Sequence, residues 1–61
     1  MNIDALRYIA NVDYPASKLE VIAEAETNGA PQELIEALQR VSRERFGSAG
    51  EVRAGLKGAG V

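Results

Sequence analysis

The chain has 61 residues and a net charge of −2 at neutral pH, and it contains neither cysteine nor histidine. Disulfide bonds are therefore excluded, and a zinc site is essentially excluded as well, because the usual structural zinc ligands are Cys and His. A chain of this length makes one domain at most, and its small core is expected to leave a lone monomer only marginally stable.

No run of apolar residues approaches the roughly 20 that a membrane-spanning helix needs. Asp4 and Arg7 interrupt the segment where a signal peptide would have its apolar core, so we expect a cytoplasmic protein. Charge is divided along the chain: the charged residues within 1–36 are mostly acidic, and those within 37–61 are mostly basic. Such a division suits a nucleic-acid contact or head-to-tail self-association, although solvated helix faces produce it more often.

The first predicted helix begins at Asn2, whose side chain can cap it, and Asp4 in its first turn suits the positive end of the helix dipole. Its apolar residues follow at helical spacing: Ile3, Leu6, Ile9 and Ala10. Residues 12–15 end the helix, since the residue before Pro15 is pushed out of the helical conformation. Tyr14 is expected to pack its ring across the junction with the next helix and to leave its hydroxyl at the surface.

The second predicted helix carries both a start and a stop signal. Ser17 and Glu20 have the spacing of a capping box, in which each side chain accepts a hydrogen bond from the other residue's free backbone N–H group. Gly29 follows Asn28 and can take the left-handed conformation that ends a helix. The two caps fix which residues face inward: Val21, Ile22 and Ala25.

Pro31 suits the first position of a third helix, where its missing N–H group costs nothing. The apolar stripe of this helix is Leu34, Ile35, Leu38 and Val41. A longer helix would carry Ser42 and Arg45 inward, so we expect it to end near residues 42 to 45, and Gly47 supplies a stop.

Ser48 and Glu51 repeat the capping-box spacing and open a short fourth helix. Its apolar face carries Val52 and Leu56. No segment alternates with a period of two, so we predict no strand. The predicted fold class is all-α, a compact bundle of three helices plus a short fourth helix with no sheet. We expect residues 1–56 to form a single helical domain and residues 57–61 to form a flexible C-terminal tail.

These residues resemble a known family. Residues 13–18 read DYPASK and residues 28–30 read NGA, with Val21, Ile22 and Ala25 between them and residues 48–52 following later. The combination resembles a family of small bacterial proteins known as domain of unknown function 2795, over most of residues 3–56. The resemblance implies a compact helical domain of bacterial origin, and it implies no activity, cofactor or catalytic residue.

The chain departs from that family in two places. Members usually carry Leu-Pro-Asp after the third helix, where this chain has Val41-Ser42-Arg43. They usually carry a polar residue at the position of Leu19.

The composition leaves little for catalysis. Without His or Cys a catalytic triad of the common kind is absent, and Ser17 and Ser48 are explained as helix caps. Carboxylates are plentiful, but a hydrolytic or metal-assisted site needs two of them converging in a cleft, which four short helices can hardly enclose. We therefore predict no enzyme, and no catalytic, cofactor-binding or metal-ligating residues.

Nucleic-acid binding is the main alternative function. The second helix, the glycine turn and the third helix follow one another as in a helix-turn-helix, and Ala25 and Gly29 have that motif's four-residue separation. Glu24 and Asn28, however, stand where the motif prefers apolar residues, and Glu33 at the start of the third helix would meet phosphates unfavourably. The candidate contacts for this alternative are Arg40, Arg43, Arg45 and Arg53.

The preferred function is protein–protein interaction, either self-association or docking to a larger partner, with no membrane contact. The small core and the divided charge both favour it. Leu19 and Ala23 lie on the flank of the second helix and are the candidate contact residues. The identity of the partner, the pathway and the oligomeric state stay open at this point.

Overall fold

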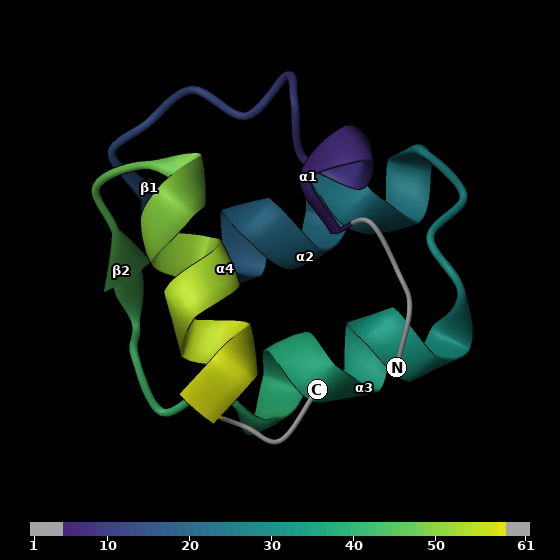
Figure 1. Cartoon of the computed structure of the whole chain (residues 1–61). Coiled ribbons are helices and arrows are strands. Elements are labelled where there is room, and N and C mark those ends of the chain that lie inside the picture. The colour runs from purple at the N-terminus through teal and green to yellow at the C-terminus, as the bar shows by residue number, and fades with distance from the viewer. Residues whose placement is uncertain (1–4, 59–61) are drawn as a thin grey trace.

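Residues 5–58 are described by the structure, a computed structural model, as four helices and a small antiparallel sheet (Figure 1). In chain order the elements are α1 (Ala5–Tyr8), β1 (Ala16–Ser17), α2 (Lys18–Thr27), α3 (Gln32–Arg40), β2 (Arg45–Phe46) and α4 (Ala49–Gly58). The mostly helical fold confirms the sequence-based prediction in its coarse form, but the prediction of no strand is wrong. Expectations for Asn2, Ile3 and Asp4 lie outside the described residues, as do those for residues 59–61.

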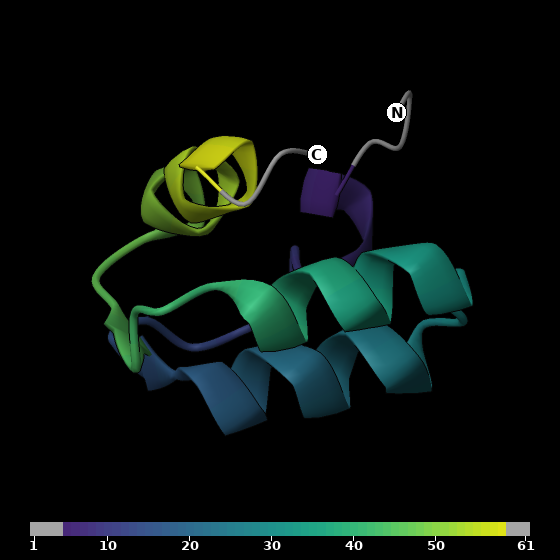
Figure 2. The ribbon, with the colours of Figure 1, turned by 90° about the horizontal axis from the view of Figure 1, so that it is seen from below.

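The helices form two groups. In both views α2 and α3 lie side by side and run in opposite directions (Figures 1 and 2). Figure 2 shows α1 and α4 together on the other side of the molecule. The core therefore lies between the α2–α3 pair and the α1–α4 side, and each helix turns one face toward it.

The buried side chains come from every part of the described chain and include the predicted inward faces of α2, α3 and α4. They are Ile9, Ala16, Val21, Ile22, Ala25, Leu34, Ile35, Ala37, Leu38, Val41, Phe46, Val52 and Leu56. Ala10, which we expected on the apolar stripe of the first helix, is exposed. The reason is that α1 ends at Tyr8, so Ala10 lies in the turn that follows and not on a helix face.

The start and stop signals of α2 are confirmed. The Glu20 backbone N–H donates to Ser17 Oγ at 3.1 Å, and the Ser17 N–H donates to Glu20 Oε1 at 3.0 Å. Gly29 has a φ of 79°, in the left-handed region that glycine adopts without steric cost. The Ala30 N–H then donates to the Ala25 carbonyl at 2.9 Å, which satisfies an acceptor that the helix end leaves free.

The boundaries of α3 differ from the prediction at both ends. Pro31 is the N-cap and not the first helical residue, so the helix begins at Gln32, one residue later than expected. The helix ends at Arg40, because Val41 is already extended with a ψ of 127°. This correction to the expected end at residues 42 to 45 has a packing reason: an extended segment allows Val41 and Phe46 both to be buried.

The small sheet follows from the early end of α3. Its register pairs Ala16 with Phe46 and Ser17 with Arg45. A strand of two residues is too short to show a period of two, which is why the sequence pattern does not predict it. The Lys18 N–H continues the pairing by donating to the Glu44 carbonyl at 2.8 Å.

Tyr14 and α4 give two further corrections. The Tyr14 hydroxyl is buried without a hydrogen-bond partner among the described residues, so the expectation of a surface hydroxyl is wrong. Burial raises the Tyr14 pKa.

In α4, Gly55 packs closely on the segment after α3: a Cβ there would lie 3.0 Å from Val41 Cγ1. Lys57 and Gly58, the first residues of the predicted tail, belong to this helix, and the flexibility of residues 57–61 stays a prediction.

Candidate interaction site

Leu19 and Ala23 lie one turn apart on the outer face of α2. Among the large hydrophobic residues within 5–58, Leu19 is the one whose side chain is exposed, at 75 %. Ala23 is exposed as well. The expected flank position of both residues is therefore confirmed, while their role as partner contacts stays a prediction. Burying an exposed apolar side chain in a contact is favourable, because it removes apolar surface from water.

A groove of about 320 Å³ runs beside this face, between α2 and the loop after α1. Its walls are formed by Asn11, Val12, Asp13, Glu20, Ala23, Glu24 and Thr27. Three of these seven residues are acidic and none is basic. The outer face of α2 therefore combines an apolar side chain with a negatively charged groove.

Two of the groove's carboxylates are held in fixed positions by hydrogen bonds. The Ser17 backbone N–H, followed by the Ser17 side chain, holds the pKa of Glu20 below its ordinary value, and Arg45 adds a smaller effect of the same sign. Glu24 Oε2 accepts from Asn28 Nδ2 at 2.8 Å, and the same amide group donates to the Tyr8 carbonyl at 2.8 Å. Asn28 thus ties α1 to α2, a contact that the sequence pattern does not predict.

Lys18 is a second residue that sequence analysis missed. Its Nζ atom donates to the carbonyls of Val41 at 2.9 Å and Gln39 at 3.3 Å, and it lies 3.5 Å from a Glu44 carboxylate oxygen. These contacts join the start of α2 to the end of α3. A signal was available: a cation in the first turn of a helix is disfavoured by the helix dipole, so a lysine there calls for contacts elsewhere.

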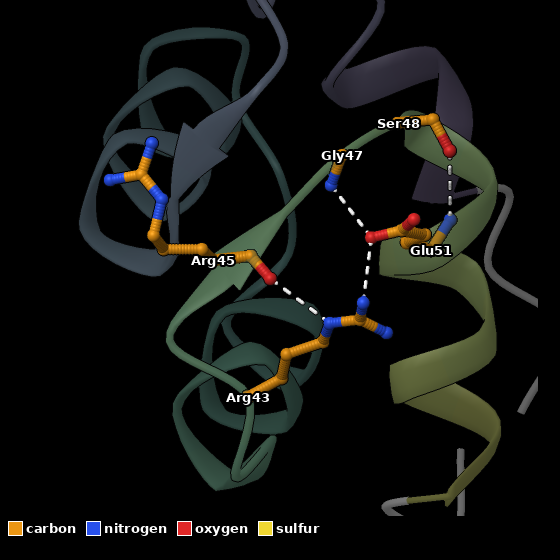
Figure 3. A network of polar contacts seen from close by, with 5 residues as sticks. All are labelled: Arg43, Arg45, Gly47, Ser48 and Glu51. Atoms are coloured by element: carbon orange, nitrogen blue, oxygen red, sulfur yellow. Dashed lines mark hydrogen bonds and ion pairs between the residues drawn. The ribbon is translucent and has the colours of Figure 1, made fainter.

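In the basic segment after α3, the Arg43 side chain makes its contacts within the fold (Figure 3). Arg43 Nη2 lies 2.8 Å from Glu51 Oε1, and Arg43 Nε donates to the Arg45 carbonyl at 3.0 Å. The guanidinium carbon of Arg43 also lies 6.0 Å from the centre of the Phe46 ring. Figure 3 shows the Arg43 side chain pointing toward α4 and the Arg45 side chain pointing away from it. The structure therefore does not bring these two cations together on one surface.

The other two candidate arginines lie apart from this network. Arg40 is exposed in the last turn of α3, and Arg53 is exposed in the middle of α4. The structure gives neither of them an ion pair within 4.0 Å among residues 5–58. The antiparallel arrangement of α2 and α3 also differs from a helix-turn-helix, whose two helices cross at about 90–120°.

Within the described part of the chain there is no group of three or more acidic residues placed to hold a metal ion. The same residues include no helix that is long and apolar enough to cross a membrane.

Residues 2–53 match the family described as protein of unknown function (DUF2795). Because the match covers most of the chain, this protein belongs to that family. A search of curated proteins and a search of solved structures each found no match to the chain. Family membership agrees with the DYPASK and NGA segments noted above, and it carries no statement about function.

Proposed function

We propose that this chain is a small protein–protein interaction domain and that the outer face of α2 is its contact surface. The observation that carries the proposal is the 75 % exposure of Leu19. Leucine side chains are commonly buried, and this one lies beside Ala23 on a regular helix above a charged groove. The proposal keeps the expectation of a bacterial cytoplasmic protein that binds a partner and needs no cofactor or catalytic residue.

The test compares the wild-type protein with Leu19→Gln. Because Leu19 is exposed, the substitution is expected to leave the circular dichroism spectrum and the melting temperature unchanged. Each protein is immobilised and offered both extract of the native host and the purified wild-type chain. We expect the variant to bind at least one partner about tenfold or more weakly than the wild-type protein does. Ala10→Gln, which also replaces an exposed apolar residue, serves as the matched control. Equal binding by the wild-type protein and Leu19→Gln would contradict the proposal.

Nucleic-acid binding is the competing function, and the exposed cations Arg40 and Arg53 are the observation in its favour. It predicts retention of the wild-type protein on DNA or heparin at low salt, with an affinity that falls steeply as salt rises. The double variant Arg40→Glu, Arg53→Glu would then lose that retention. We expect the wild-type protein to be retained no more than the double variant. Arg43 is already paired with Glu51, and the exposed Glu33 at the start of α3 would repel phosphates.

A further inference from the structure

The exposed side of α4 complements the outer face of α2 in charge. Its residues follow at spacings of three and four and so lie on one helix face: Gly50, Arg53, Ala54, Lys57 and Gly58. Two of the five residues are cations, the other three are small, and none is acidic. The buried residues of α4 point the other way, into the core: Val52 and Leu56. This face, which we call the basic face of α4, therefore has no partner within the described chain.

The outer face of α2 has the opposite charge. Glu20, Glu24 and Glu26 lie around Leu19 and Ala23, and the basic residue of the helix, Lys18, turns toward α3. Both α2 and α4 have ten residues, so the two faces have the same length of about 15 Å. Small residues on α4 leave room for a leucine from another helix, since helix axes approach more closely where side chains are small.

We propose that the outer face of α2 docks on the basic face of α4 of a second copy of this chain, in a head-to-tail contact. The proposal rests on the proposed function and names its partner. An α2–α2 contact would place acidic groups against acidic groups, which costs free energy in any interface. The opposite signs of α2 and α4 select the head-to-tail arrangement instead.

The two faces cannot meet within one molecule. Figure 2 shows α2 and α4 on opposite sides of the molecule, and each turns its buried residues toward the core between them. Their exposed faces therefore point away from each other. A pair of copies leaves one α2 face and one α4 face free, so the contact extends into chains or closes into a ring. One contact between ten-residue helices is smaller than the roughly 1,200 Å² of a stable interface, and we expect weak association, on the order of 100 µM.

Sedimentation of the full chain between about 10 µM and 1 mM tests the proposal. The average mass of the wild-type protein is expected to rise past that of a dimer, and to fall as salt is added because the contact is charged. Leu19→Gln removes the apolar residue of the α2 face, and Arg53→Glu reverses a charge on the α4 face. Each variant alone is expected to associate at least about tenfold more weakly. Arg40→Glu, the same charge reversal at the end of α3, is the control and is expected to associate like the wild-type protein.

An equimolar mixture of the two variants gives the sharpest result. The intact α4 face of Leu19→Gln can bind the intact α2 face of Arg53→Glu, and the remaining two faces are both altered. We therefore expect a 1:1 heterodimer that does not grow further. A mixture as weak as either variant alone would overturn the head-to-tail contact, as would an Arg53→Glu protein that associates like Arg40→Glu. A wild-type protein that stays monomeric at 1 mM and low salt would overturn it too, while capture of another protein through Leu19 would still uphold the proposed function.

Discussion

The two Ser-x-x-Glu segments of the chain carry the same residues at the same spacing, but they make different contacts. At the start of α2, Ser17 and Glu20 bond to each other in both directions. At the start of α4, the Glu51 N–H donates to Ser48 Oγ at 3.4 Å, but the Glu51 carboxylate accepts from the Gly47 N–H at 2.7 Å instead of the Ser48 N–H. The second capping box is therefore only half formed, which corrects the sequence-based expectation (Figure 3).

Arg43 accounts for the difference. Its guanidinium group binds the Glu51 carboxylate from the side of the segment that follows α3, and this keeps the carboxylate near Gly47. A Cβ at position 47 would lie 3.0 Å from Glu51 Oε2, so glycine leaves the space that this contact needs. Local signals thus determine both ends of α2, at residues 17 and 29, whereas contacts between distant segments determine the region from the end of α3 to the start of α4, residues 40–51. The predictions that follow test this contrast.

The largest effect is expected at Gly29, in the locally determined region. Gly29→Val should lower the free energy of unfolding by about 2 kcal/mol, because a β-branched residue is strained in the left-handed conformation. No atom of a neighbouring element lies within 4 Å of the position that a Cβ would take, so the cost comes from the backbone alone. Urea unfolding measures it, with Gly29→Asn as the control that tolerates this conformation. An unchanged unfolding midpoint would show that the turn does not depend on its glycine.

Lys18 links the two regions, and its removal is expected to have the next largest effect. Lys18→Met keeps the apolar stem but loses the hydrogen bonds from Nζ to the carbonyls of Gln39 and Val41, so we expect a loss of about 1.5 kcal/mol. The Lys18 side chain is only 17 % exposed, which limits screening by water. Lys57→Met, at an exposed position of α4, is the matched control and should change stability by less than about 0.5 kcal/mol. Equal effects of the two substitutions would contradict a structural role for Lys18.

The contrast also explains how far the sequence predicts the fold. The caps of α2 and the buried faces of three helices follow from neighbouring residues, through hydrogen bonds and a helical period that any local window contains. The end of α3 does not, because it depends on Lys18, some twenty positions away, and on the burial of Phe46. For the candidate site, the exposure of Leu19 and Ala23 is predictable from helix register. The separation of Arg43 from Arg45 is not, since it depends on Glu51, which binds Arg43, and on β2, which contains Arg45.

Glu51 and Arg43 test the second region directly. Glu51→Ala removes both the bond from the Gly47 N–H and the ion pair, and we expect a loss of about 1 kcal/mol, since the ion pair is half exposed and contributes little by itself. Arg43→Ala should cost less in the Glu51→Ala background than in the wild-type protein. A double-mutant cycle by urea unfolding measures this coupling. Strictly additive effects would show that Arg43 does not hold Glu51.

Two glycines of α4, Gly50 and Gly55, test helix propensity and packing separately within one helix. Gly50→Ala should stabilise the protein by about 0.5 kcal/mol, because alanine favours the helix and a Cβ there meets only Ser48 Oγ, at 3.6 Å. Gly55→Ala should give no gain or a small loss, since its Cβ would lie 3.0 Å from Val41 Cγ1 and would force the two segments apart. Melting temperatures measure the difference between the two variants. Equal stabilisation by both would mean that α4 does not pack on Val41 as described.

The smallest effect concerns pH and separates the complete capping box from the half-formed one. The pKa of Glu20 in the folded protein lies below its ordinary value of 4.5, chiefly because the Ser17 N–H donates to the carboxylate. The folded state therefore binds this proton less readily than the unfolded state, so the contribution of Glu20 to stability is present above pH 4.5 and is lost as pH falls through the lowered pKa. In Glu20→Gln the side-chain oxygen still accepts the hydrogen bond but does not titrate, so the variant should lose less stability between about pH 5 and pH 3 than the wild-type protein does. Carboxyl NMR shifts report the Glu20 pKa directly, and a value at or above 4.5 would show that Ser17 does not hold the charged carboxylate. The test distinguishes α2 from α4, because the Glu20 carboxylate accepts a hydrogen bond from the N–H group of its capping serine, Ser17, whereas the Glu51 carboxylate accepts one from the Gly47 N–H group.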